Sequence, residues 1–211
     1  NAKSLVSIAD IGIRNAGIGL HFITAETCTV DRVNLSSNAT GFLAEVTTRG
    51  CVISNSAMSF CTTGIQILDA VRNRFTSNRV AVSRSNGIEI VGGDINTIES
   101  NTISGGNSVG ILFAAFADSN TVRYNAVSAH PSDGFQVNNS YWNFLLGNTS
   151  TGNNIGFEVL LTSRFNTLRN NSSTLDTSQG FLVSAVRNTL ETNTAAGAKL
   201  AQGFNISGDT N

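Results

Sequence analysis

The chain has 211 residues, a formal net charge of −1 and only 13% charged side chains, which predicts one ordinary-sized domain over residues 1–211. Lys and Arg are not in excess, so we expect no nucleic-acid partner, and no apolar stretch approaches the roughly 20 residues needed to span a membrane. Asn, Ser and Thr number 26, 24 and 22, so about a third of the chain is small and polar, which is far from average usage.

A Gly followed by the pattern apolar, any residue, apolar recurs along the whole chain at intervals of 22–24 residues. Such alternation is typical of a short strand with one buried face, and a fixed period of this length indicates a repeat fold. The copies of this motif, in chain order, lie at residues 19–22, 41–44, 64–67, 87–90, 110–113, 134–137, 156–159, 180–183 and 203–206.

A second motif, Asn followed by one residue and then an apolar residue, keeps the same register. Its first Asn residues are Asn73, Asn96, Asn120, Asn143, Asn166 and Asn188. Another Asn follows each of them five residues later, at Asn78, Asn101, Asn125, Asn148, Asn171 and Asn193. In the two earliest copies Cys28 and Cys51 stand where the later copies have the first Asn.

These repeats predict an all-β fold, a right-handed parallel β-helix of about nine coils with 22–24 residues each. One copy cannot bury its own apolar residues, but stacked copies form a continuous core. Interior columns are then expected, one from Leu20 to Phe204 that includes Phe157, and a second from Phe22 to Ile206. The Asn residues would form hydrogen-bonded columns, or asparagine ladders, at the corners.

The Asn and Gly motifs resemble those of right-handed parallel β-helix proteins of the NosD-like and pectate-lyase-like superfamily, over roughly residues 5–207. The resemblance implies the fold. It leaves the activity open, because these families include polysaccharide lyases, hydrolases, epimerases, phage tail fibres and surface modules.

A candidate site comes from the corner position two residues before each first Asn, which places Asp94, Asp118, Tyr141 and Arg164 on four successive coils. Stacked carboxylates would hold a proton or attract a hard cation such as Ca²⁺, and Tyr141 and Arg164 would supply a proton donor and a clamp for an acidic sugar. The alternative, which we favour, is that the two aspartates bond their own backbone in turns.

Further ligand-binding candidates are Trp142, which adjoins Tyr141 and offers a ring for stacking on sugars, and Arg123. Pairing of Arg123 with Glu99 and of Arg169 with Glu191 across adjacent strands would be ordinary surface pairing. His130, in the irregular stretch from residue 127 to residue 134, is expected to be a solvated turn residue.

The three cysteines are predicted to be free, with Cys28 and Cys51 stacked and buried and Cys61 unpaired. At both ends apolar strands begin or stop close to the terminus. We therefore expect self-association through uncapped ends, or a fragment of a larger chain.

Two functions remain open. The first is an extracellular or surface β-helix module with a structural or interaction role and possible polysaccharide binding. The second is a carbohydrate-active enzyme, a lyase, hydrolase or epimerase, that acts on the side face of the solenoid. Few acids and bases cluster on any face, so the sequence favours the non-catalytic surface module over the enzyme. Calcium is the one cofactor that the sequence suggests, at Asp94 and Asp118.

Overall fold

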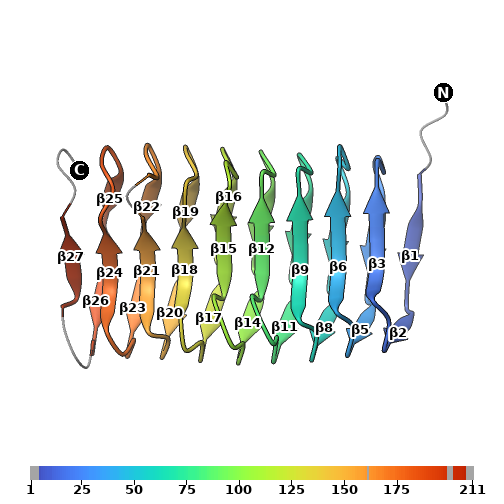
Figure 1. Cartoon of the computed structure of the whole chain (residues 1–211), viewed down its shortest axis with the longest axis horizontal. Coiled ribbons are helices and arrows are strands. Elements are labelled where there is room, and N and C mark those ends of the chain that lie inside the picture. The colour runs from blue at the N-terminus through green and yellow to red at the C-terminus, as the bar shows by residue number, and fades with distance from the viewer. Residues whose placement is uncertain (1–4, 161, 199–201, 208–211) are drawn as a thin grey trace.

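The chain winds into a β-solenoid in which every coil contributes one strand to each of three parallel sheets (Figure 1). The computed structural model describes residues 5–160, 162–198 and 202–207. Each sheet has nine strands, and each strand pairs in parallel with its counterparts in the preceding and following coils. The predicted all-β solenoid of about nine coils is confirmed.

The first sheet, sheet A, carries the strands that begin after the first Asn of the repeat. Its members in order are β1 (Ser7–Ala9), β4 (Thr29–Asp31), β7 (Val52–Ser54), β10 (Arg74–Thr76), β13 (Thr97–Glu99), β16 (Thr121–Arg123), β19 (Phe144–Leu146), β22 (Thr167–Arg169) and β25 (Thr189–Glu191).

Sheet B carries the strands that begin after the second Asn. Its members are β2 (Gly12–Arg14), β5 (Asn34–Ser36), β8 (Ala57–Ser59), β11 (Arg79–Ala81), β14 (Thr102–Ser104), β17 (Ala126–Ser128), β20 (Thr149–Thr151), β23 (Ser172–Thr174) and β26 (Thr194–Ala196).

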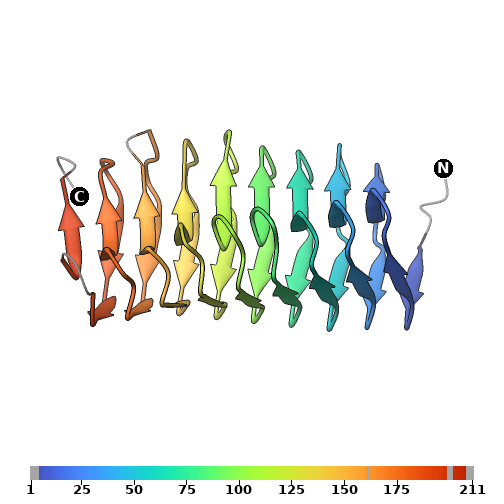
Figure 2. The same cartoon turned by 60° about the horizontal axis from the view of Figure 1, so that its bottom comes forward.

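Sheet C carries the longer strands of the Gly motif, which Figure 1 shows as a row of parallel arrows. Its members are β3 (Ile18–Ile23), β6 (Thr40–Glu45), β9 (Thr63–Leu68), β12 (Ile88–Val91), β15 (Ile111–Ala114), β18 (Asp133–Val137), β21 (Ile155–Val159), β24 (Gln179–Val183) and β27 (Phe204–Ile206). Figure 2, turned by 60°, shows the turns that join the sheets repeating from coil to coil.

The core is a set of apolar columns that run along the solenoid axis, as predicted. Phe157 is fully buried, and its ring stacks between those of Phe135 and Phe181 with centroids 4.6 and 4.8 Å away. At the last described coil the column ends in Phe204, which is 42% exposed because no further coil covers it in the described chain.

The asparagines of both columns bond to the neighbouring coils, and all of them are buried except Asn193 in the last coil, which is partly exposed. Asn125 Oδ1 accepts from the backbone N–H of Asn101 and from its side-chain amide, both at 2.9 Å. The Asn101 amide also donates to the carbonyl of Phe75 at 2.9 Å, so one side chain joins three coils. Since buried polar groups without partners are costly, these bonds explain why Asn recurs at each interval.

Corners are turned by residues in the left-handed backbone region, many of which are not glycine. In the corner between sheets C and A, one residue per coil adopts this conformation immediately before the first Asn of the repeat. Trp142, Phe165 and Arg187 have φ values of 53°, 59° and 58° there. Their side chains project outward, so this corner presents side chains that take no part in the core.

The prediction for the cysteines is confirmed: Cys28, Cys51 and Cys61 are free and buried. The backbone N–H of Cys28 donates to the Sγ atom of Cys51 at 3.4 Å. In later coils the corresponding backbone N–H donates to an Asn Oδ1 atom instead. Burial raises the pKa of the Cys51 thiol to about 11.

The expectation of a solvated His130 is wrong. This side chain is only 2% exposed, because it occupies the inward position that Asn153 occupies one coil later, in the corner between sheets B and C. Its ring lies over Gly106, where a Cβ atom would come within 2.5 Å of the imidazole, and its Nδ1 lies 3.1 Å from the carbonyl oxygen of Ser108. Burial lowers the pKa of His130.

Charged side chains on the outer face of sheet A pair across adjacent strands, as predicted. Arg123 lies 2.6 Å from Glu99, and Arg169 lies 3.3 Å from Glu191. Arg74 contacts Glu99 from the other side, and these hydrogen bonds lower the pKa of the Glu99 carboxyl. In the described part of the chain no helix is long and apolar enough to cross a membrane.

Candidate functional site

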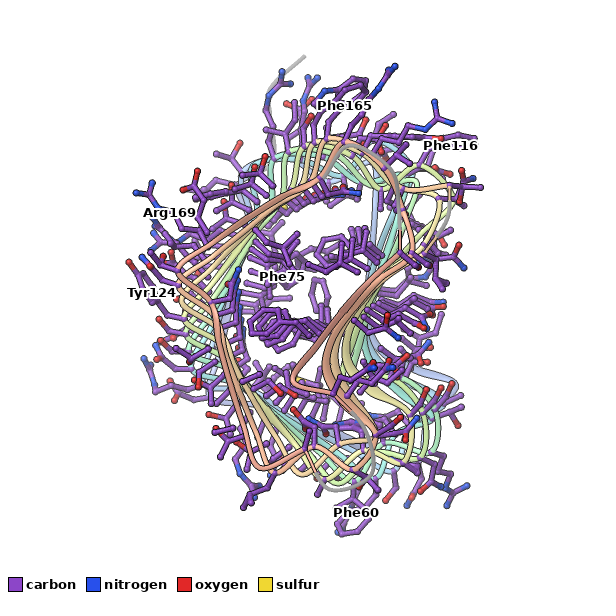
Figure 3. The ribbon with its side chains drawn as sticks, turned by 90° about the vertical axis from the view of Figure 1, so that its left-hand side faces the viewer. Phe60, Phe75, Phe116, Tyr124, Phe165 and Arg169 are labelled. Carbon is purple, nitrogen blue, oxygen red and sulfur yellow. The ribbon has the colours of Figure 1, made fainter. Side chains whose placement is uncertain are left out.

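The corner between sheets C and A gathers most of the predicted site residues. Asp94, Asp118, Tyr141 and Arg164 follow one another on four successive coils, and the backbones of Tyr141 and Arg164 form a parallel bridge. Trp142 lies beside Tyr141 at the same corner. The end-on view in Figure 3 shows Phe165 and Phe116, which share this corner, on the same side of the cross-section.

The two aspartates bond the backbone of the next coil, not their own turn. Asp94 Oδ1 accepts from the backbone N–H of Asp118 at 2.9 Å, and Asp118 Oδ1 accepts from that of Tyr141 at 2.7 Å. Burial, and then the neighbouring charge of Asp94, raise the pKa of Asp118, although the Tyr141 N–H acts in the opposite direction. Both carboxylates therefore have a structural role that neither of our two readings anticipated.

These residues do not fit a calcium site. Ca²⁺ takes about six to eight oxygen ligands, and one oxygen of each aspartate is already bonded to a backbone N–H. Among the residues that the structure describes, no group of three or more His, Cys, Asp or Glu side chains is placed to hold a metal ion.

Four rings form a continuous row at this corner, which we call the aromatic corner (Phe116, Tyr141, Trp142 and Phe165). Phe116 stacks on Tyr141 with centroids 6.1 Å apart, and Tyr141 tilts against Trp142 at 5.7 Å. Trp142 stacks on Phe165 at 5.5 Å with an interplanar angle of 6°. The row thus follows the solenoid axis across three coils.

The aromatic corner is largely exposed. Phe116 and Trp142 are each 57% exposed and Phe165 is 41% exposed, while the Tyr141 hydroxyl donates to Asn139 Oδ1 at 3.2 Å. On the far side of Phe165 the guanidinium of Arg187 lies over the ring, 5.9 Å from its centroid. Exposed rings in a contiguous patch are a feature of ligand-binding surfaces.

Arg123, also predicted to bind ligand, lies apart from this corner. It ends β16 on sheet A, and its Nε donates to Glu99 Oε2 at 2.6 Å. Phe165 and Arg187 were not among our candidates, although Phe165 occupies the position of Trp142 one repeat later. Reading the column immediately before each first Asn would have found both residues.

A second polar group on the outer side of sheet C was also missed. Asp133 is only 4% exposed, and Gln136 Nε2 donates to Asp133 Oδ2 at 2.8 Å and to Glu158 Oε2 at 2.6 Å. Burial, and then the charge of Glu158, raise the pKa of Asp133 to about 7. The pair is diagonal, since it joins two different columns, so a search down single columns could not find it.

Comparison with known proteins identifies the family. Residues 16–173 match the family model described as "Right handed beta helix region". The chain belongs to this family. Comparison with curated protein sequences found no match.

Solved structures with the same fold include enzymes and an adhesin. The periplasmic alginate epimerase AlgG aligns with a TM-score of 0.72 at 15% identity over 85% of this chain and 48% of that one. A mutant DFA-IIIase from Arthrobacter chlorophenolicus A6 aligns with a TM-score of 0.76 at 10% identity, over 90% and 56%. The Streptococcus pneumoniae surface protein and adhesin PfbA gives 0.71 at 12% identity, over 96% and 65%.

These similarities establish the fold alone, because all three identities are low. The chain also spans only 48–65% of the length of these three proteins.

Proposed function

We propose that this β-helix is an extracellular or surface module that binds polysaccharide through the aromatic corner. The observation that carries the proposal is the row of exposed, contacting rings along the solenoid axis. An alginate epimerase and a surface adhesin among the proteins of similar structure support it.

The fold itself does not require rings at this corner. In the column that contains Trp142 and Phe165, other coils make the same turn with Thr27, Gly50 and Ser119. Exposing an apolar ring to water is unfavourable, whereas a polar or small residue would turn the corner without that cost. A contiguous row of rings, unlike the exposed apolar residues Phe60 and Ile95, is therefore better explained by a ligand than by folding.

Aromatic side chains suit a sugar ligand because they combine a large apolar surface with few rotatable bonds. A polymer that lies along the axis would contact several coils at once, so weak contacts would add up. In the preceding coil the same column position holds Ser119, which is too small to cover the indole ring of Trp142, so that ring stays accessible to a ligand.

Binding to a glycan array, followed by titration calorimetry, tests the proposal. Trp142→Thr and Phe165→Thr should each weaken binding about five- to 100-fold, if a ring face that a sugar covers contributes as much as one that a stacked base covers, on the order of 1–3 kcal/mol. The matched control is Phe60→Thr, since Phe60 is a 54% exposed corner residue with a φ of 56° on the opposite side of the solenoid (Figure 3). Absence of any glycan binding, or equal effects of all three substitutions, would contradict the proposal.

A second candidate function, glycan cleavage or epimerisation, is favoured by one observation. Gln136 Nε2 donates to both Asp133 and Glu158, so two carboxyl groups lie side by side, and burial raises the pKa of Asp133 to about 7, which suits general acid–base chemistry. Incubation with the polysaccharides that bind, followed by product analysis, tests this function. Asp133→Asn should abolish turnover and leave binding at the aromatic corner unchanged.

A further inference from the structure

We propose that the polysaccharide bound at the aromatic corner is anionic, and that Arg164 and Arg187 bind its carboxylate or sulfate groups. This inference rests on the proposed function and names the chemical class of its ligand.

The charge of the corner differs between its two ends. Arg164 and Arg187 lie on the coils of β22 and β25 and are exposed, and among the described residues no carboxylate oxygen lies within 4 Å of either guanidinium. The other exposed arginines of this half of the solenoid are different, since Arg169 and Arg123 are paired with glutamates on sheet A. Two cations at the corner are thus free to bind an anion.

The aspartates of the same corner lie too far along the axis to neutralise these arginines. Asp118 belongs to the coil of β16, two coils before Arg164. Adjacent parallel strands are about 4.8 Å apart, so the separation is on the order of 10 Å, beyond the Debye length of about 8 Å at physiological salt. The end of the corner near β22 and β25 is therefore locally positive.

Arg187 is also held in place. Trp142, Phe165 and Arg187 form one stack, in which the guanidinium lies over the outer face of the Phe165 ring. Stacking occupies the face of the guanidinium and leaves its N–H donors, which lie at the edge, available to a planar oxyanion. An arginine restrained in this way loses less side-chain entropy when it binds.

The rings run along the corner and the two cations follow at one end, an order that suits a charged sugar polymer. Along the axis a polysaccharide chain would first meet Phe116, then Tyr141 and Trp142 on the next coil. Arg164 and Phe165 follow on the coil after that, and Arg187 lies one coil further. The apolar faces of the sugars would contact the rings while their anionic groups reach the guanidinium groups. A neutral polysaccharide would leave the two arginines without a role.

A polyuronate and its methyl ester form the decisive pair of probes, because esterification removes the charge and keeps the sugar ring. The full chain should bind the polyuronate at least tenfold more tightly than the ester in calorimetry, with affinity falling as salt rises. A sulfated polysaccharide, tested alongside, shows whether sulfate serves as well as carboxylate. Equal affinity for polyuronate and ester overturns the inference, and so does equal affinity for a single-stranded oligonucleotide.

Two double variants separate charge from stacking. Arg164→Gln with Arg187→Gln should weaken polyuronate binding at least tenfold and leave ester binding unchanged, while the control Arg123→Gln with Arg169→Gln should alter neither. If Trp142→Thr abolishes binding of both probes and the arginine variant affects neither, the proposed function stands and this inference fails. If the parent chain binds no glycan, both fail.

Discussion

Asn143 Oδ1 accepts hydrogen bonds from both nitrogens of Asn120, at 2.9 Å from the backbone and at 3.2 Å from the side chain. The Asn143 amide in turn donates to the carbonyl of Ala117 at 2.9 Å. One buried amide therefore satisfies three groups of the preceding coil. It lies directly inside the aromatic corner, next to Trp142, and holds the start of β19 against the preceding coil.

Removing this amide should destabilise the solenoid. Asn143→Ala leaves the backbone N–H of Asn120 and the carbonyl of Ala117 buried without this partner, while the Asn120 amide keeps its bond to the carbonyl of Gly93 at 2.8 Å. Each buried group left unpaired costs about 1–3 kcal/mol. We expect a total loss of about 2–5 kcal/mol in the free energy of unfolding, measured by urea denaturation. Asn34→Ala, which alters an exposed strand residue, should change it by less than about 0.5 kcal/mol.

The stacked phenylalanines allow a test of the core. Phe157→Ala removes a ring held between two others and should cost about 3–5 kcal/mol in unfolding free energy. Phe60→Ala removes a ring of the same size from an exposed corner and should cost less than about 1 kcal/mol. Similar losses for both variants would mean that the assignment of the inner and outer faces is wrong.

The buried thiols should be unreactive in the folded protein. Burial raises the pKa of Cys51 to about 11, and it raises that of Cys61 as well, so little thiolate is present at pH 8. Iodoacetamide should label none of the three cysteines in native protein and all three in guanidinium chloride, as read by mass spectrometry. Rapid labelling of Cys51 in the native state would contradict its burial.

Asp133 should make stability depend on pH. Its pKa of about 7 in the folded protein exceeds the ordinary value of 3.8, so the folded state binds more protons between these limits, and stability falls as pH rises from about 4 to 7. Asp133→Asn removes the free-energy cost of ionising a buried carboxyl group. The variant should exceed the parent in unfolding free energy by roughly 2–4 kcal/mol at pH 8 and lose that advantage towards pH 4.

Glu191→Gln is the control for this measurement. Glu191 is an exposed partner of Arg169, so its substitution should change stability by less than about 1 kcal/mol at either pH. The prediction is contradicted if the unfolding free energy of the parent protein rises between pH 4 and pH 7 and Asp133→Asn removes that rise. Such a result would mean that the fold stabilises the charged form of Asp133.

The fold was predictable because period and side-chain pattern repeat in register: the Gly motif fixes sheet C, and the two Asn columns fix the turns beside sheets A and B. His130 was mispredicted because it occupies a position where other coils have Asn, and sequence spacing alone did not show that Gly106 leaves room for an imidazole. Asp133 and Glu158 were missed because their contact is diagonal. The stack of Phe165 on Trp142 depends on outward rotamers, which no residue pattern determines.

The corner turns described above separate what the chain needs for folding from what it shows to its surroundings. At the turn before each first Asn, residues as different as Thr27, Arg72 and Trp142 adopt nearly the same left-handed backbone conformation. Surface chemistry can therefore change in evolution at these sites while the core columns and the buried amides stay constant. A binding surface on such a scaffold is extended by duplicating coils, because each added coil brings one more exchangeable position at the same corner of the cross-section.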